Sequence, residues 1–128
     1  METIHTDEAP PHTGPVPQAV CAGGWISVSA LFGADAKTHT IPEDAAEEAG
    51  VLFDNLTAIL AAGGVTLTAV VRVGIVMRDL QADRPVFNKV WVERFGDHRP
   101  ARSAIQSAQF GRKGENARFM LEVTAYRG

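Results

Sequence analysis

The sequence predicts one α+β domain, residues 1–128, in which two helices pack on one β-sheet as a two-layer ββαβαββ sandwich. Two long amphipathic stretches that end in glycine predict the helices, and short runs of β-prone residues around them predict the strands. The length is sufficient for one hydrophobic core but not for two. We therefore expect a single domain with a crossover connection through each helix and a hairpin at each end.

The N-terminal part predicts an extended lead-in followed by a hairpin. Four of the seven prolines lie before Val20, and such a density of proline disfavours a helix. The β-prone runs 18–22 and 25–29 are separated by Gly23-Gly24, which is a two-residue hairpin signal. Residues 30–41 show little periodicity and are predicted to form a loop.

Residues 43–62 show the longest helical pattern. Acidic residues in the first turn complement the helix dipole, and Gly63-Gly64 marks the end. Apolar residues recur at spacings of three and four and form a stripe that faces a core: Ala45, Ala49, Leu52, Leu56, Ile59 and Leu60. We expect Glu47 and Glu48 to lie on the solvent-exposed face of this helix.

The middle of the chain predicts a buried strand and a second helix. Residues 70–77 are rich in β-branched side chains and nearly all apolar, which is typical of a central strand. The second helix is predicted to contain Pro85 in its first turn and to run to about Phe95, with Gly96 as its end. Its apolar residues are expected in the core: Val86, Phe87, Val90, Trp91 and Phe95.

Two further strands, 103–110 and 117–126, are predicted around a turn-rich link at 111–116. Residues alternate in the last strand, so that Phe119, Leu121, Val123 and Ala125 form an apolar face and Met120, Glu122, Thr124 and Tyr126 a mixed one. An uncovered sheet face of this composition would favour aggregation. We therefore expect subunits of a homo-oligomer to meet there.

Composition and charge argue against several classes of protein. Hydrophobic residues make up 45% and charged residues 21%, as in ordinary globular proteins, and no apolar run approaches the roughly 20 residues of a membrane span. The acidic N-terminus does not resemble a secretory signal, so we expect a cytoplasmic protein that binds no membrane. The formal net charge of −3 argues against binding of nucleic acid.

The cysteine and histidine pattern predicts no metal, and we expect no cofactor. Cys21 is the sole cysteine and cannot form an internal disulfide. His5, His12, His39 and His98 are scattered, and no pair has the spacing of a helical metal site.

The segment from His98 to Ala104 contains the candidate functional side chain. Arg99 and Arg102 flank Pro100 between a predicted helix and a predicted strand, so Arg102 lies on backbone with little freedom. A guanidinium offers a planar fork of donors that matches a carboxylate. A surface ion pair is the more common role of an arginine, and residue type alone leaves both interpretations open.

Several short motifs, in order along nearly the whole chain, are similar to those of the RidA (YjgF) family. They are Gly14-Pro15, Gln18-Ala19, Val28-Ser29, Asp54-Asn55-Leu56, Ala58-Ile59, Arg78-Asp79-Leu80, Phe87-Asn88 and Pro100-Ala101-Arg102-Ser103. The resemblance implies a chorismate-mutase-like α+β fold and a homotrimer whose sheets form an inner barrel. It also implies three sites in the clefts between subunits, which hydrolyse reactive imino and enamine acids to 2-keto acids and ammonia.

The resemblance assigns candidate roles to individual residues. Arg102 matches the arginine that grips the substrate carboxylate, Ser29 the site serine, and Asn88 the helix asparagine near the site. Glu122 matches the second glutamate of a Glu-x-Glu pattern in the last strand, and we count it with Arg102 and Ser29 as candidate catalytic residues. It points to the same face as residue 120 but roughly 6 to 7 Å away.

Other positions depart from the family pattern. Val16 replaces a tyrosine, Ala30 a glycine, Ala104 a cysteine and Met120 the first glutamate of the last strand. We expect these residues and Phe87 to line the substrate site and to make it more apolar.

These observations imply a divergent imine deaminase. The alternative is a non-catalytic or regulatory trimer that binds small carboxylates through Arg102, because the arginine is retained while the first glutamate is lost. A ribonuclease, an activity sometimes attached to this family, is disfavoured by the negative net charge and by the lack of a basic cluster interleaved with aromatics.

Overall fold

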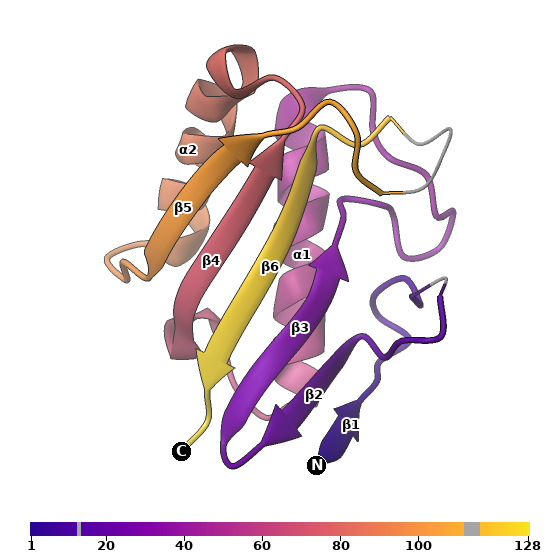
Figure 1. Ribbon diagram of the computed structural model, residues 1–128, viewed down its shortest axis with the longest axis vertical. Helices are drawn as coiled ribbons and strands as arrows, with labels where there is room; N and C mark the ends of the chain where they lie inside the picture. The colour runs from indigo at the N-terminus through magenta and orange to yellow at the C-terminus, as the bar shows by residue number, and fades with distance from the viewer. Residues whose placement is uncertain (13, 112–115) are drawn as a thin grey trace.

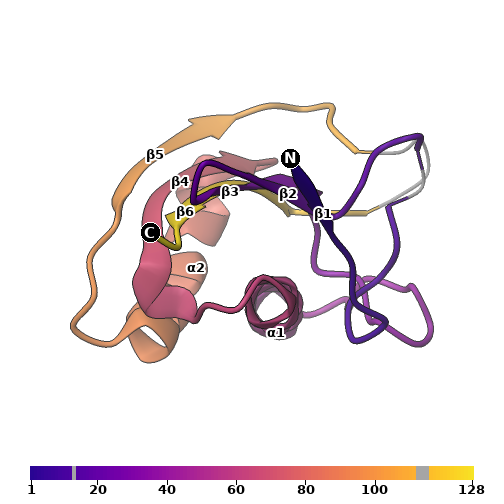
Figure 2. The same ribbon diagram turned by 90° about the horizontal axis from the view of Figure 1, so that it is seen from below.

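The computed structural model describes residues 1–12, 14–111 and 116–128 and contains one six-stranded sheet (Figure 1). Its strands are β1 (Glu2–Ile4), β2 (Ala19–Ala22), β3 (Trp25–Leu31), β4 (Val70–Met77), β5 (Ala101–Gln106) and β6 (Phe119–Tyr126). The helices are α1 (Ala45–Ala62) and α2 (Leu80–Phe95), and a short 3-10 turn, Leu67–Ala69, precedes β4. Both helices lie on one face of the curved sheet (Figure 2). The predicted two-layer α+β class is confirmed.

The N-terminal hairpin forms as predicted. Strands β2 and β3 pair in antiparallel register from Ala19 opposite Val28 to Ala22 opposite Trp25. Gly23 and Gly24 both have positive φ angles, 57° and 84°, which glycine adopts without strain. The sequence prediction lacked β1, a short strand that pairs with β2 at the sheet edge.

The predicted C-terminal hairpin is wrong. The strand order is β1-β2-β3-β6-β4-β5, so β4 lies between β5 and β6. Strand β5 runs parallel to β4, as a crossover through α2 requires, and is an exposed edge strand. Strand β6 is interior, and its alternate residues are buried as the sequence pattern predicted. Part of the predicted link at 111–116 lies outside the described residues.

Side-chain caps set the starts of both helices. Asp44 accepts a hydrogen bond from the Glu47 amide at 3.0 Å, so α1 begins at Ala45. Asp79 accepts one from the Ala82 amide at 3.0 Å, so α2 begins at Leu80 and Pro85 lies in its second turn rather than in the predicted first turn. The proline lies inside the helix, where its missing N–H removes one backbone hydrogen bond.

The core lies between the sheet and the two helices and contains a cluster of aromatic rings. Phe87 of α2 is fully buried, with its ring centroid 5.9 Å from that of Phe53 and 5.2 Å from that of Phe119. Trp91 and Phe95 extend the cluster along α2, their centroids 4.5 Å apart. The predicted apolar face of α2 therefore packs in the core, except Val86, which is half-buried.

The prediction that Glu48 lies on the solvent-exposed face of α1 is wrong, because Glu48 is fully buried. Its carboxylate accepts hydrogen bonds from Arg118 Nη1 at 2.9 Å and from the Arg118 amide at 2.7 Å. Burial raises the pKa of the Glu48 carboxyl above its ordinary value, and the bonds to Arg118 oppose that change. Glu47 is exposed, as predicted.

Candidate functional site

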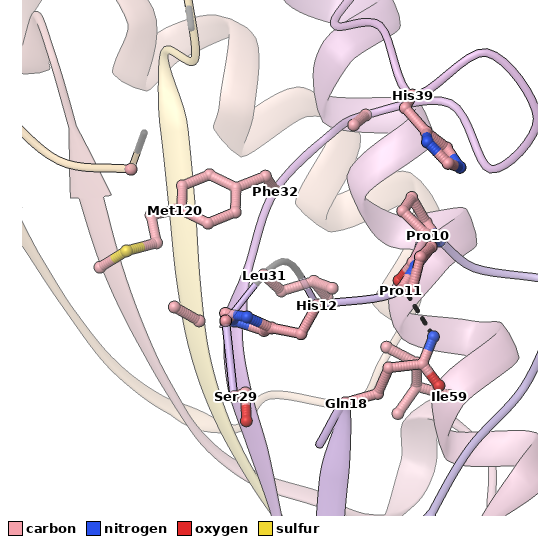
Figure 3. Close-up of a pocket in the computed structure, with 14 residues that line it drawn as sticks. Pro10, Pro11, His12, Gln18, Ser29, Leu31, Phe32, His39, Ile59 and Met120 are labelled. Atoms are coloured by element: carbon pink, nitrogen blue, oxygen red, sulfur yellow. Dashed lines mark hydrogen bonds between the residues drawn. The ribbon is translucent and has the colours of Figure 1, made fainter. Parts of the chain in front are cut away.

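A pocket of about 410 Å³ lies between the proline-rich lead-in and the end of β3 (Figure 3). Most of its lining residues are apolar, among them Pro10, Pro11, Ala30, Leu31, Phe32, Ile59 and Met120. Its polar side chains are those of His12, Gln18, Ser29 and His39. The pocket therefore brings together three predicted site residues, Ser29, Ala30 and Met120. We call it the Ser29 pocket.

Gln18 fixes one wall of the Ser29 pocket. Its buried side-chain nitrogen donates to the carbonyl oxygen of Pro10 at 3.0 Å (Figure 3). The same nitrogen donates to the Thr6 carbonyl oxygen at 3.1 Å, and the side-chain oxygen accepts from the Thr6 amide at 2.8 Å. Ser29 Oγ donates to the Pro17 carbonyl oxygen at 2.7 Å. The Ser29 bond fastens the lead-in to β3, and the Gln18 bonds hold residues 6–10 of the lead-in against the start of β2.

Asn55 fixes the loop after β3, which contributes Phe32 and Ala34 to the lining of the pocket. This buried residue of α1 donates from Nδ2 to the carbonyl oxygens of Phe32 at 3.0 Å and Ala34 at 2.8 Å. Gly33 lies between those two residues, and a Cβ there would come within 2.4 Å of the Glu48 carbonyl oxygen. The loop after β3 thus lies close against α1, and only glycine fits at position 33.

A second group of predicted site residues lies at the β5 edge of the sheet, beside α2. The guanidinium carbon of Arg102 is 4.7 Å from the ring centroid of Trp91 and 5.8 Å from that of Phe87. Arg102 and Ala104 are half-buried in alternation with exposed Ser103, whose Oγ accepts a hydrogen bond from Arg72 at 2.9 Å. Arg102 therefore lies on the helix side of the sheet. We call this group the Arg102 site.

The Arg102 site is electropositive. Burial lowers the pKa of the Arg102 guanidinium from its ordinary value, and the charge of Arg84 lowers it further. Within the described part of the chain, no hydrogen bond or ion pair engages this guanidinium. Asn88 lies on α2, and its Oδ1 atom is buried and has no hydrogen-bond partner among the described residues. A bound anion would satisfy the Arg102 guanidinium.

Two other predicted site residues, Val16 and Glu122, lie in neither group. Val16 is 44% exposed on the lead-in, and the lining of the Ser29 pocket does not include it. Glu122 is exposed on the bare face of the sheet, opposite Gly74 of β4. Phe87 is fully buried and meets Arg102 only through its ring. One chain therefore carries two separate parts of the predicted site, with β4 and β6 lying between Arg102 and Ser29 in the sheet.

Two polar residues of the Ser29 pocket were not predicted as site residues. Gln18 appeared in the sequence only as part of a family motif, and its role in fastening the lead-in depends on the fold. In the sequence, His12 is only one of four scattered histidines. Its ring nitrogen Nδ1 is buried with no hydrogen-bond partner among the described residues.

Comparison with known proteins decides the family. A family model described as Endoribonuclease L-PSP matches residues 6–126. The chain belongs to this family, which is also known as the RidA (YjgF) family. It is 31% identical over 129 residues to a 2-iminobutanoate/2-iminopropanoate deaminase of Escherichia coli, covering 98% of each chain.

Two solved structures show the same fold over nearly the full length of both chains. RidA from an Antarctic Psychrobacter is 32% identical to this chain and superposes with a TM-score of 0.91. The match covers 98% of this chain and 99% of the Psychrobacter chain. Escherichia coli TdcF with bound serine is 27% identical, covers 100% of each chain and has a TM-score of 0.92. The predicted RidA-like fold is confirmed.

The described residues offer no metal site and no membrane span. Nowhere in 1–12, 14–111 and 116–128 do three His, Cys, Asp or Glu side chains lie together as a metal site would require. No helix in the same ranges is both long and apolar enough to cross a membrane.

Proposed function

We propose that this protein hydrolyses 2-imino and enamine acids to 2-keto acids and ammonia in a homotrimer. Arg102 of one subunit would hold the substrate carboxylate beside the Ser29 pocket of its neighbour. The observation that carries the proposal is the half-buried Arg102 guanidinium, which lies over Trp91 and has no hydrogen-bond or ion-pair partner among the described residues. The deaminase name of the Escherichia coli relative supports the reaction class.

The chemistry of Arg102 suits a carboxylate ligand. A guanidinium stays charged at physiological pH and donates two parallel hydrogen bonds to a carboxylate. The Trp91 ring against which the guanidinium packs restricts the orientation of Arg102. The positive charge of Arg84 increases the local attraction for an anion. The serine bound to TdcF, a small molecule with a carboxylate, is consistent with this ligand class.

Two observations support a site shared between subunits. The Arg102 site and the Ser29 pocket lie apart within one chain, so a second copy is needed to place them side by side. The bare face of the sheet also carries large exposed apolar side chains, Trp25, Tyr126 and Ile105, which are 49%, 47% and 60% exposed. Such a face is typical of a subunit interface. Glu122 lies on this face, so in our proposal its carboxylate acts only within the assembly.

Hydrolysis of an imine next to a carboxylate needs orientation, a placed water and proton transfer. Arg102 would fix the carboxylate and so orient C2, and oriented binding alone lowers a barrier by several kcal/mol. The Ser29 hydroxyl donates its hydrogen bond to the Pro17 carbonyl oxygen. The lone pairs of Ser29 Oγ can therefore accept a hydrogen bond from the imine N–H or from the water. Water then adds to C2, and the C–N bond breaks to release ammonia.

An assay with an imino acid made in situ tests the proposal. An amino-acid dehydratase or oxidase generates the imino acid, and keto-acid release is followed with and without the protein. We expect acceleration that disappears in Arg102→Ala and is weak in Arg102→Lys, which keeps the charge but not the fork. Arg99→Ala is the matched control, because Arg99 bonds to the Gly96 and His98 carbonyl oxygens of its own segment. If the protein accelerates the hydrolysis of no imino acid in a panel with different side chains, the proposed deaminase activity is refuted.

A regulatory trimer that only binds carboxylates is the second candidate, because the Met120 thioether replaces the glutamate of the family pattern. Calorimetric titration with 2-ketobutyrate separates the two. Binding that requires Arg102, together with a silent deaminase assay, would favour the regulatory protein. A ribonuclease, named in the description of the family model, gains no support from the net charge of −3.

A further inference from the structure

His12 lies in the wall of the Ser29 pocket, on the lead-in that Gln18 holds against the start of β2 (Figure 3). Its side chain is half-buried, and its Nδ1 atom is buried without a hydrogen-bond partner among the described residues. A buried polar atom left unpaired costs about 1–3 kcal/mol, so such atoms are few and require an explanation. Imidazole is also the side chain best suited to exchange a proton near neutral pH.

The other polar side chains of the pocket are either hydrogen-bonded to the backbone or exposed to solvent. Gln18 is held by bonds to the lead-in backbone, and the Ser29 hydroxyl donates its proton to Pro17. His39 is exposed to solvent. The Met120 thioether can neither take nor give a proton in this reaction. Among the described lining residues, His12 is therefore the half-buried group that can carry a proton.

We infer that His12 is the acid–base residue of this site. The inference rests on the proposed function. The imidazole accepts a proton from water as the water oxygen bonds to C2 of the substrate iminium, which forms a carbinolamine. The imidazolium then protonates the carbinolamine nitrogen. The C–N bond breaks with its electron pair leaving on ammonia, the C2=O bond forms, and the hydroxyl proton passes to solvent.

Substitution of His12 tests this role separately from binding. His12→Gln keeps a polar side chain but cannot carry a proton, so we expect kcat to fall about 10²-fold, as for other general acid–base groups, with KM nearly unchanged. The Kd for 2-ketobutyrate should also stay unchanged, because Arg102 holds the carboxylate. His5→Gln is the matched control, since His5 is an exposed histidine of the same N-terminal part, bonded to Asp7.

Chemical rescue distinguishes proton transfer from a structural role. His12→Ala opens space in the pocket wall, and added imidazole should restore keto-acid release in a saturable manner that follows the unprotonated fraction of the imidazole. Melting temperature and oligomer mass show that each variant is folded and assembled. A His12→Gln variant with wild-type kcat, or a folded His12→Ala variant that imidazole does not rescue, would overturn the inference. If the wild-type protein accelerates no imino acid, the proposed function fails first and the role of His12 fails with it.

Discussion

The Arg102 guanidinium carbon lies 4.7 Å from the Trp91 ring centroid, which couples the edge strand β5 to helix α2. A cation held over an aromatic face is restricted in orientation, and the contact contributes about 0.5–2 kcal/mol. Arg102 has no acidic partner in the described chain to hold it in place. The aromatic ring therefore sets the direction in which its donors point.

Trp91→Leu should weaken carboxylate binding, because it removes the ring below Arg102. We expect the Kd for 2-ketobutyrate, measured by calorimetry, to rise about 2- to 30-fold, the range that corresponds to loss of the cation–π contact. Phe95→Leu is the control, since Phe95 is buried to the same degree in the same cluster but does not contact Arg102. Both variants should lose about 1–3 kcal/mol of stability. Equal binding by the two variants would contradict the assigned role of Trp91.

Ile105→Asp should dissociate the oligomer. Ile105 is 60% exposed on the bare face of the sheet, so a charge there should leave the monomer folded but disrupt contact between subunits. We expect light scattering after gel filtration to report a trimer for the wild-type protein and a monomer for the variant, with loss of deaminase activity. Ala46→Asp, on the exposed side of α1, should remain trimeric. A monomeric, active variant would contradict a site shared between subunits.

Glu48 should contribute a stability that decreases as pH rises. Burial raises the pKa of the Glu48 carboxyl above its ordinary value near 4.5, so the folded protein binds this proton more tightly than the unfolded chain does. Its contribution is fully present below the unfolded pKa and is lost as pH rises through the folded pKa. Glu48→Gln removes the titration and keeps an acceptor for the Arg118 amide.

Denaturant unfolding of the wild-type protein and Glu48→Gln at several pH values measures this effect. The wild-type free energy of unfolding, relative to that of the variant, should fall as pH increases from below 4.5 toward neutrality. Glu47→Gln, at an exposed position in the same turn, should show no such trend. A relative stability that rises with pH would mean that the bonds to Arg118 outweigh burial.

Local patterns in the sequence predicted most of the fold. The glycine pair after β2, the apolar stripe of α1 and the alternation in β6 each depend on neighbouring residues, and all three are confirmed. Glu48 could have been predicted as buried, because it lies four residues before Leu52 on the same stripe. The strand order could not have been predicted, because a link such as 111–116 is compatible either with a hairpin or with a return past β4.

The candidate site was less accessible to sequence reasoning. Arg102, Ser29 and Asn88 were found through short motifs, but their separation into two groups follows from the sheet order. The inclusion of His12 in the Ser29 pocket depends on how Gln18 holds the lead-in against the start of β2. Nothing in the spacing of His12 from Ser29 indicates this contact.

Subunit mixing tests the central claim most directly. Arg102→Ala removes the carboxylate anchor, and Ala30→Phe fills the Ser29 pocket, so each variant alone should assemble and be inactive. In trimers formed from an equal mixture, a site shared between subunits regains both parts wherever an intact Arg102 faces an intact pocket. Random assembly then restores about a quarter of the wild-type sites. We predict this recovery of activity, and mixed trimers that stay inactive would contradict an intersubunit site.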